Sequence, residues 1–299
     1  MKIKKIVLFF IITIVSVQSS EAQEWFTNLD VAKRLAHIQD KMLLVVWEES
    51  FDYAYPLFYV SDNGDAEVVD LSVNKSLDAI IWEHFIPVLI NESEYDNLIK
   101  DADGRGAQYI AKLNDDSIKI MDANKNILNV KTYIDRDQNL SFLIEVYSLR
   151  TTFLRQDLIN YSKQENFTTS FNLGSKYIDF ALFVEKKARE EIIDLANIYL
   201  NEARIHLTKD DLKNKLAYAQ RIDLLAIKED LVLDKARRAS RFLKRINKLE
   251  VDSINYSLYS FLNYTTFIML KDEENAALWK NDVSEADIKK TELIFNINN

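Results

Sequence analysis

Three carboxylates and two tyrosines gather in one short stretch, LLVVWEESFDYAYP. Glu48, Glu49 and Asp52, with Tyr53 and Tyr55, follow a run of apolar residues. Two carboxylates can divide the roles of general acid and general base when burial pushes their pKa values apart. The same residues are also typical of a solvated acidic loop, because charged side chains are rarely buried without partners. We interpret the stretch as such a loop and keep a carboxylate-dependent enzyme, with its site between two domains, as the alternative.

Other kinds of catalytic and metal-binding residue are sparse in this sequence. The three histidines stand in different segments, at His37, His84 and His206. None has a second histidine three or four residues away, so no metal site is expected. The stretch DANKN at 122–126 resembles the start of a calcium loop, but Ile127 and Tyr133 stand where glycine and glutamate are required. We interpret it as a hairpin turn and expect no cofactor.

The net charge and the first residues of the chain indicate which partners are unfavourable and where the protein is located. The net charge of −9 disfavours nucleic acid and anionic membrane surfaces as partners. Three lysines at the start are followed by an apolar run, and then Ser20 and Ala22 precede Gln23. This is the pattern of a secretory signal, and its apolar run is too short to span a bilayer comfortably. We therefore predict a signal peptide over residues 1–22, export to the periplasm or beyond, and no membrane span in the mature chain.

The first half of the chain alternates between helix and strand signals. An amphipathic pattern predicts a helix over 28–40, and the continuous apolar run that follows predicts a strand buried on both faces. The expected elements after these are a short strand at 67–71, a helix at 74–82, a strand at 85–90, a helix at 93–99 and a hairpin around 118–130. Parallel strands with crossover helices and a final antiparallel pair make a mixed α/β sheet.

The second half is poor in residues that break helices. From Lys125 to the end there is one glycine, Gly174, and no proline, which predicts an all-helical region. Apolar residues recur at spacings of three and four from Leu173 to Ala203 and predict one long helix. Further helices are expected around 212–225, 231–249, 251–270 and 284–295. We place the domain boundary in the polar stretch 135–139, which we expect to be exposed.

Three stretches together resemble the thioredoxin-like superfamily, in the version found in exported proteins with a helical extension. They are VAKRLAHIQDKMLLVVWEES, HFIPVLINESEY and DDSIKIMDANKNIL. The resemblance places a redox cysteine pair within 51–54 and a cis-proline at Asp115 or Asp116, but this chain has no cysteine and no proline there. Because disulfide exchange needs a thiolate, the resemblance implies a redox-inactive member of the family. It also implies a trans peptide bond at the aspartates.

The predicted fold is an α/β thioredoxin-like N-terminal domain over residues 23–136, followed by an all-α helical bundle domain over residues 137–299. By analogy with the family, we expect a non-catalytic protein that binds another envelope protein or a peptide. A helical region that acts as a platform for a partner is a further alternative. The candidate binding face consists of Trp47, Glu48, Glu49, Phe51, Asp52, Tyr53, Tyr55, Pro56, Asp115 and Asp116. On a binding face, at least two of the three rings in 51–55 should be exposed.

Overall fold

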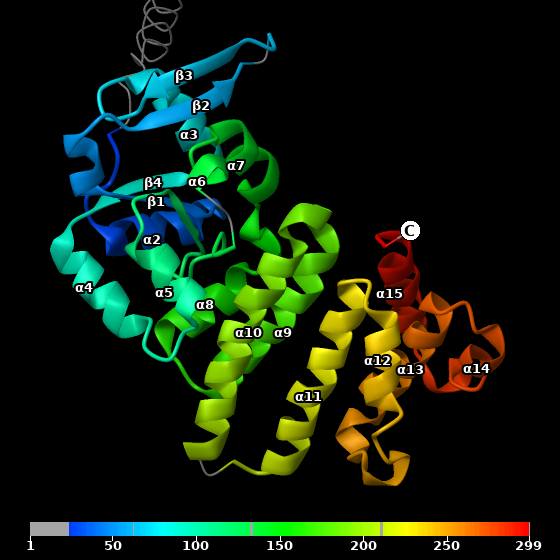
Figure 1. Ribbon diagram of the computed structural model, residues 1–299. Helices are drawn as coiled ribbons and strands as arrows, with labels where there is room; N and C mark the ends of the chain where they lie inside the picture. The colour runs from blue at the N-terminus through cyan, green and yellow to red at the C-terminus, as the bar shows by residue number, and fades with distance from the viewer. Residues whose placement is uncertain (1–23, 62, 132–133, 210–211, 299) are drawn as a thin grey trace, which may run out of the picture.

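A computed structural model describes residues 24–61, 63–131, 134–209 and 212–298. The protein is mostly helical and contains a small mixed sheet (Figure 1). An α/β region is followed by a helical region, as the sequence predicts. The predicted signal peptide lies outside the described residues.

The sheet is built on a central apolar strand. Its three strands are β1 (Leu43–Trp47), β4 (Ile86–Ile90) and β5 (Lys119–Met121). Their order is β4-β1-β5, with β4 parallel and β5 antiparallel to β1. Single bridges extend the sheet at both edges, from Phe26 to Val88 and from Met121 to Ile127.

Both faces of β1 are covered, which explains why all five of its residues are buried. On one face, Leu43 and Val45 pack with side chains from α2, α4 and α5. On the other face, Leu44 and Val46 join a large core that continues into the helical region. The bounds of these helices and of the helix before β4 are α2 (Leu29–Gln39), α3 (Asp78–His84), α4 (Glu92–Asp101) and α5 (Ala107–Asn114).

A two-stranded hairpin lies beside the sheet, and the sequence analysis predicted only its second strand, at 67–71. Strands β2 (Pro56–Val60) and β3 (Ala66–Asp70) pair antiparallel in a separate two-stranded sheet. The backbone N–H of Phe58 donates to the carbonyl of Gln138 at 2.8 Å, just before α7 (Leu140–Tyr147). The hairpin therefore lies beside α7, above the main sheet in the view of Figure 1.

The rest of the described chain is mainly helical: α6, α7 and α8 lie near the sheet, and α11 to α14 lie progressively farther from it (Figure 1). Their bounds are α6 (Ile134–Asp137), α8 (Arg155–Lys163), α9 (Phe167–Phe180), α10 (Lys186–Lys209), α11 (Lys215–Val232), α12 (Ala236–Leu243), α13 (Tyr256–Met269), α14 (Glu273–Ala277) and α15 (Glu285–Asn296). The helices predicted around 212–225 and 231–249 correspond to α11 and α12 with shifted ends.

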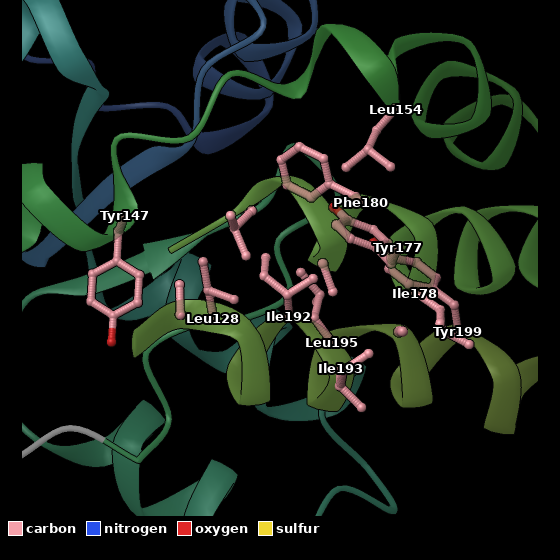
Figure 2. Close-up of a cluster of buried hydrophobic side chains, with 14 of the residues drawn as sticks. Leu128, Tyr147, Leu154, Tyr177, Ile178, Phe180, Ile192, Ile193, Leu195 and Tyr199 are labelled. Carbon is pink, nitrogen blue, oxygen red and sulfur yellow. The ribbon is translucent and has the colours of Figure 1, made fainter. Parts of the chain in front are cut away.

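The predicted single helix from Leu173 to Ala203 is wrong. The chain breaks after α9, passes through a 3₁₀ turn (Ala181–Phe183) and returns as α10. The rings of Tyr177 and Tyr199 then stack with 5.6 Å between their centres and 5° between their planes, in the cluster of Figure 2. The apolar spacing continued across the turn because both helices bury the faces that they turn towards each other.

The packed core crosses the predicted domain boundary. The cluster that contains Leu44 and Val46 also contains Leu143, Tyr177 and Ile192. Within the stretch expected to be exposed, Asp137 is fully buried and ion-paired with Lys112. The expectation of an exposed linker is therefore wrong at Asp137, while the assignment of two domains stays a prediction.

Candidate functional site

A hollow of about 610 Å³ opens where the central strand β1 ends. It is lined by Trp47, Glu49, Ser50, Tyr53, Ala54, Tyr55, Glu92, Tyr95, Asn114, Asp116 and Gln138. Five of these residues belong to the predicted binding face: Trp47, Glu49, Tyr53, Tyr55 and Asp116. Glu48, Phe51, Asp52, Pro56 and Asp115 lie in the same segments but do not line the hollow.

Trp47 is held in place from three sides. Its indole Nε1–H donates to the carbonyl oxygen of Asp115 at 2.9 Å. The ring of Tyr95 meets it edge-on, with 4.7 Å between ring centres. The amine of Lys119 lies 5.1 Å from the centre of the indole ring. Trp47 is 7% exposed, so these contacts fix one wall of the hollow.

Lys119 is a fully buried cation beside this wall. Its amine donates to the carbonyl oxygen of Ser117 at 2.8 Å and lies 3.1 Å from a carboxylate oxygen of Asp115. Burial lowers the pKa of Lys119 to about 8, although the neighbouring Asp115 opposes the shift. Burial disfavours ionisation of Asp115, but the hydrogen bond from Ser117 and the charge of Lys119 outweigh it and lower its pKa. The pair therefore holds the 115–117 turn against Trp47.

The three aromatic rings of the turn after β1 differ in their exposure to solvent. Tyr53 is 79% exposed, whereas Tyr55 is 4% exposed and donates its hydroxyl to the carbonyl of Asp116 at 2.9 Å. Phe51 is half-buried and packs against Trp25, with 5.7 Å between ring centres. The expectation that at least two of these rings are exposed is wrong, because Tyr55 and Phe51 complete the core between the turn and the sheet.

The predicted acidic residues keep their contact with solvent. Glu48, Glu49 and Asp52 are all exposed and lie on a 3₁₀ turn (Glu48–Asp52). Asp116 is also exposed, and the peptide bonds at 115 and 116 are trans, as predicted. Exposure removes the burial that an acid–base pair in this turn would require.

The sequence analysis missed several residues of the hollow. Glu92 and Tyr95 follow β4 as Glu49 follows β1, and the carboxyl ends of parallel strands lie at one edge of a sheet. That rule could have predicted, from the sequence, that both residues lie near Glu49. Gln138 lies at the hollow, where its carbonyl oxygen accepts a hydrogen bond from Phe58 of the hairpin, and no sequence pattern indicated this contact. The hydroxyl of Ser50 is buried and has no hydrogen-bond partner among the described residues.

The chain has no cysteine, and the described residues contain no cluster of three or more potential metal ligands. No helix in the described part of the chain is both long and apolar enough for a membrane span. Comparisons with protein-family models, with curated proteins and with solved structures found no match.

Proposed function

We propose that the protein is a redox-inactive, thioredoxin-like protein of the cell envelope that binds a protein or peptide segment in the hollow beside Trp47. The envelope location is inferred from the sequence of residues 1–22. The observation that carries the binding role is a hollow with aromatic walls and an acidic rim, in a chain without a thiol.

The strand arrangement supports the thioredoxin-like part of this proposal. The family has parallel strands joined by crossover helices and then an antiparallel pair. Here β1 and β4 are parallel, β5 is antiparallel, and the bridge from Met121 to Ile127 begins the final pair. The hollow opens at the carboxyl ends of β1 and β4, where open α/β sheets commonly bind ligands.

The composition of the hollow favours a basic segment as the occupant. Glu49, Glu92 and Asp116 supply negative charge, and the lining includes no lysine or arginine. Tyr53 is exposed at its edge, and an aromatic face attracts a lysine or arginine side chain. An extended segment with a basic side chain matches both features.

The alternative enzyme has less support from the geometry. It requires buried carboxylates in the turn after β1, but Glu48, Glu49 and Asp52 are exposed. A helical docking platform would present a continuous apolar face, whereas exposed apolar side chains such as Phe183, Leu216 and Leu278 stand on separate elements. We therefore retain the peptide-binding role.

Fluorescence anisotropy with three short labelled peptides tests the proposal. The peptides are alike except that the first carries lysines, the second glutamines and the third glutamates. We expect binding of the lysine peptide, weakening as salt is added, and none of the glutamate peptide. Equal affinity for all three peptides, or for none, would contradict the proposal.

Two neighbouring glutamates provide a matched pair of variants. Glu49→Lys places a positive charge in the hollow, whereas Glu48→Lys makes the same change at an exposed position outside its lining. The first variant should weaken binding roughly tenfold or more, while the second stays within about threefold of the wild type. Equal losses would assign the effect to net charge and not to the hollow.

A further inference from the structure

The helical region of this acidic protein contains one strongly basic stretch, residues 235–248. It holds seven of the 38 lysines and arginines of the chain and no aspartate or glutamate, although the net charge of the whole chain is −9. All seven cations are exposed. They are Lys235, Arg237, Arg238, Arg241, Lys244, Arg245 and Lys248. The local charge of this surface is therefore opposite to the net charge, from which an anionic membrane was expected to be an unfavourable partner.

Helix α12 holds part of the basic stretch on its outer face. Ala236, Ala239 and Leu243 recur at spacings of three and four and are buried in the main core. Arg237 and Arg241 are four residues apart and exposed, so they share the face that is turned away from this core. The buried side of α12 packs against α11 and α13 (Figure 1). The fold therefore leaves the cations facing solvent.

Most of these cations have no carboxylate partner. Among the described residues, only Arg238 of the basic stretch forms an ion pair, with 3.3 Å between its Nε and a carboxylate oxygen of Asp230. Like charges four residues apart on a helix destabilise it, and Arg237 and Arg241 are such a pair. A negatively charged surface beside the stretch would relieve this repulsion.

The first carboxylates after the basic stretch make local contacts. Oε1 of Glu250 accepts a hydrogen bond from the side-chain amide of Asn247 at 3.0 Å. Oδ1 of Asp252 accepts from the backbone N–H of Ile254, also at 3.0 Å. Lys248 lies instead against an aromatic ring, with its amine 4.9 Å from the centre of the Trp279 ring. These two carboxylates therefore leave the seven cations in excess.

Exposed apolar side chains accompany the cations. Phe242 is 39% exposed, and its ring centre lies 5.6 Å from the central guanidinium carbon of Arg238 and 5.8 Å from that of Arg245. Leu249, directly after the basic stretch, is 93% exposed. The surface thus combines positive charge with apolar groups that contact water.

Two further exposed apolar side chains lie at the same end of the helical region as Leu249. They are Leu216, in the first turn of α11, and Ile254. The side-chain amide of Asn255 donates to the carbonyl oxygen of Ala217 at 2.7 Å, which joins the chain next to Ile254 to the chain next to Leu216. The start of α11 and the connection from α12 to α13 both lie at the lower end of the helical region in Figure 1.

This combination favours a membrane surface over other anionic partners. Lysine and arginine side chains are attracted to anionic lipid headgroups, and guanidinium groups suit phosphate oxygens in particular. Phenylalanine and leucine side chains can enter the boundary between headgroups and acyl chains. A nucleic acid would attract the cations equally, but it offers an exposed leucine no apolar surroundings.

We propose that the basic stretch and Leu249 form a peripheral binding site for a membrane surface that contains anionic phospholipid. The cations contact the lipid phosphates, and the side chains of Phe242 and Leu249 enter the boundary between headgroups and acyl chains. Such a contact lies along the membrane surface and requires no spanning helix. The site shares no residue with the hollow beside Trp47, so each proposal can fail without the other.

Sedimentation of the full chain with lipid vesicles tests the proposal. One set of vesicles is phosphatidylcholine alone, and the other is phosphatidylcholine and phosphatidylglycerol in equal parts. We expect binding to the mixed vesicles, weakening as salt is added, and much weaker binding to the neutral ones. Equal binding to both sets, or binding to neither, would overturn the proposal.

A matched pair of double variants assigns the binding to the basic stretch. Residues 1–22 are themselves basic and apolar, but every variant carries them, so they contribute equally to each measurement. Arg241→Gln with Lys244→Gln should weaken binding to the mixed vesicles roughly tenfold or more. Lys186→Gln with Lys187→Gln makes the same change of net charge at exposed positions near the start of α10 and should leave the affinity unchanged. Equal losses in the two double variants would overturn the assignment to this surface.

Leu249→Ser distinguishes a membrane from other polyanions. Because Leu249 is exposed, thermal unfolding of the variant should match that of the wild type, whereas its binding to the mixed vesicles should weaken roughly fivefold or more. Unchanged binding of this variant would overturn the proposed insertion of the leucine. Tighter binding of the wild type to single-stranded DNA than to the mixed vesicles would overturn the choice of a lipid surface.

Discussion

Replacing Glu229 by glutamine should stabilise the protein at neutral pH and have little effect in mild acid. Glu229 lies on α11 and is 8% exposed. One of its oxygens accepts a hydrogen bond from the amide of Asn197 at 3.0 Å, and the other is buried without a partner. Burial raises the pKa of Glu229 from 4.5 to about 7, against the smaller opposing effect of Asn197.

The sign of the pH dependence follows from the proton that the folded protein retains. Between pH 4.5 and about 7 the folded state keeps this proton while the unfolded state releases it. The free energy of unfolding therefore falls as the pH rises through this window and levels off above it. The shift corresponds to at most about 3 kcal/mol for Glu229, since each pH unit is worth about 1.4 kcal/mol.

Urea denaturation of the wild type and of Glu229→Gln, at about pH 5 and about pH 8, measures this effect. The wild type should lose about 1 to 3 kcal/mol more than the variant between the two pH values. Glu190→Gln is the matched control, because Glu190 is exposed and pairs with Lys131 at the surface. Its loss between the two pH values should equal that of the wild type. Parallel losses in the wild type and Glu229→Gln would refute the reasoning.

The remaining predictions concern the helix pair, a buried ion pair and the redox activity. Gly174→Ala should destabilise the protein by about 1 to 3 kcal/mol in urea denaturation, because the added carbon would lie 2.8 Å from Leu200. A net stabilisation would mean that the higher helix propensity of alanine outweighs this crowding. Asp137→Ala should cost about 3 to 5 kcal/mol, because it removes the carboxylate paired with the buried amine of Lys112; a smaller loss would show that the amine finds another partner. In an insulin-reduction assay the cysteine-free protein should show no rate above the dithiothreitol blank, and measurable turnover would contradict the proposed lack of redox activity.

The sequence predicted the sheet because β1 has a strong and simple pattern. A continuous apolar run fits a strand that is covered on both faces, and Leu43 to Trp47 is such a strand. Strand β3 was predicted, but β2 and its pairing with β3 were missed, although Asn63 and Gly64 stand between the strands and Asn-Gly is a strong hairpin signal. The turn between α9 and α10 was not predictable from spacing, because Tyr177 and Tyr199 keep the apolar periodicity on both sides of it.

The candidate binding face was predictable only in part. Trp47 and Asp116 were placed together through a resemblance, and both line the same hollow. The inward orientation of Tyr55 was not predictable, because it depends on a hydrogen bond to the backbone of Asp116 sixty-one residues later. A further hollow of about 410 Å³, beside the turn at Asp122, was not predicted because its polar side chains come from distant elements, including Lys33 on α2 and Glu202 on α10.

The turn at Asp122 also determines how the chain can be divided into fragments. Asp122 directly follows β5 of the sheet, while two of its four hydrogen-bond donors, Tyr177 and Tyr199, belong to α9 and α10. Cleavage of the chain between Asp122 and α9 would leave the carboxylate on one fragment and its two tyrosine donors on the other. In each fragment alone, water would have to solvate polar groups that are hydrogen-bonded to the other fragment in the intact protein. Two separately produced fragments should therefore reassociate. The hydrogen bonds between the two fragments would make the protein suitable for complementation experiments, in which the association of one fragment with the other is measured.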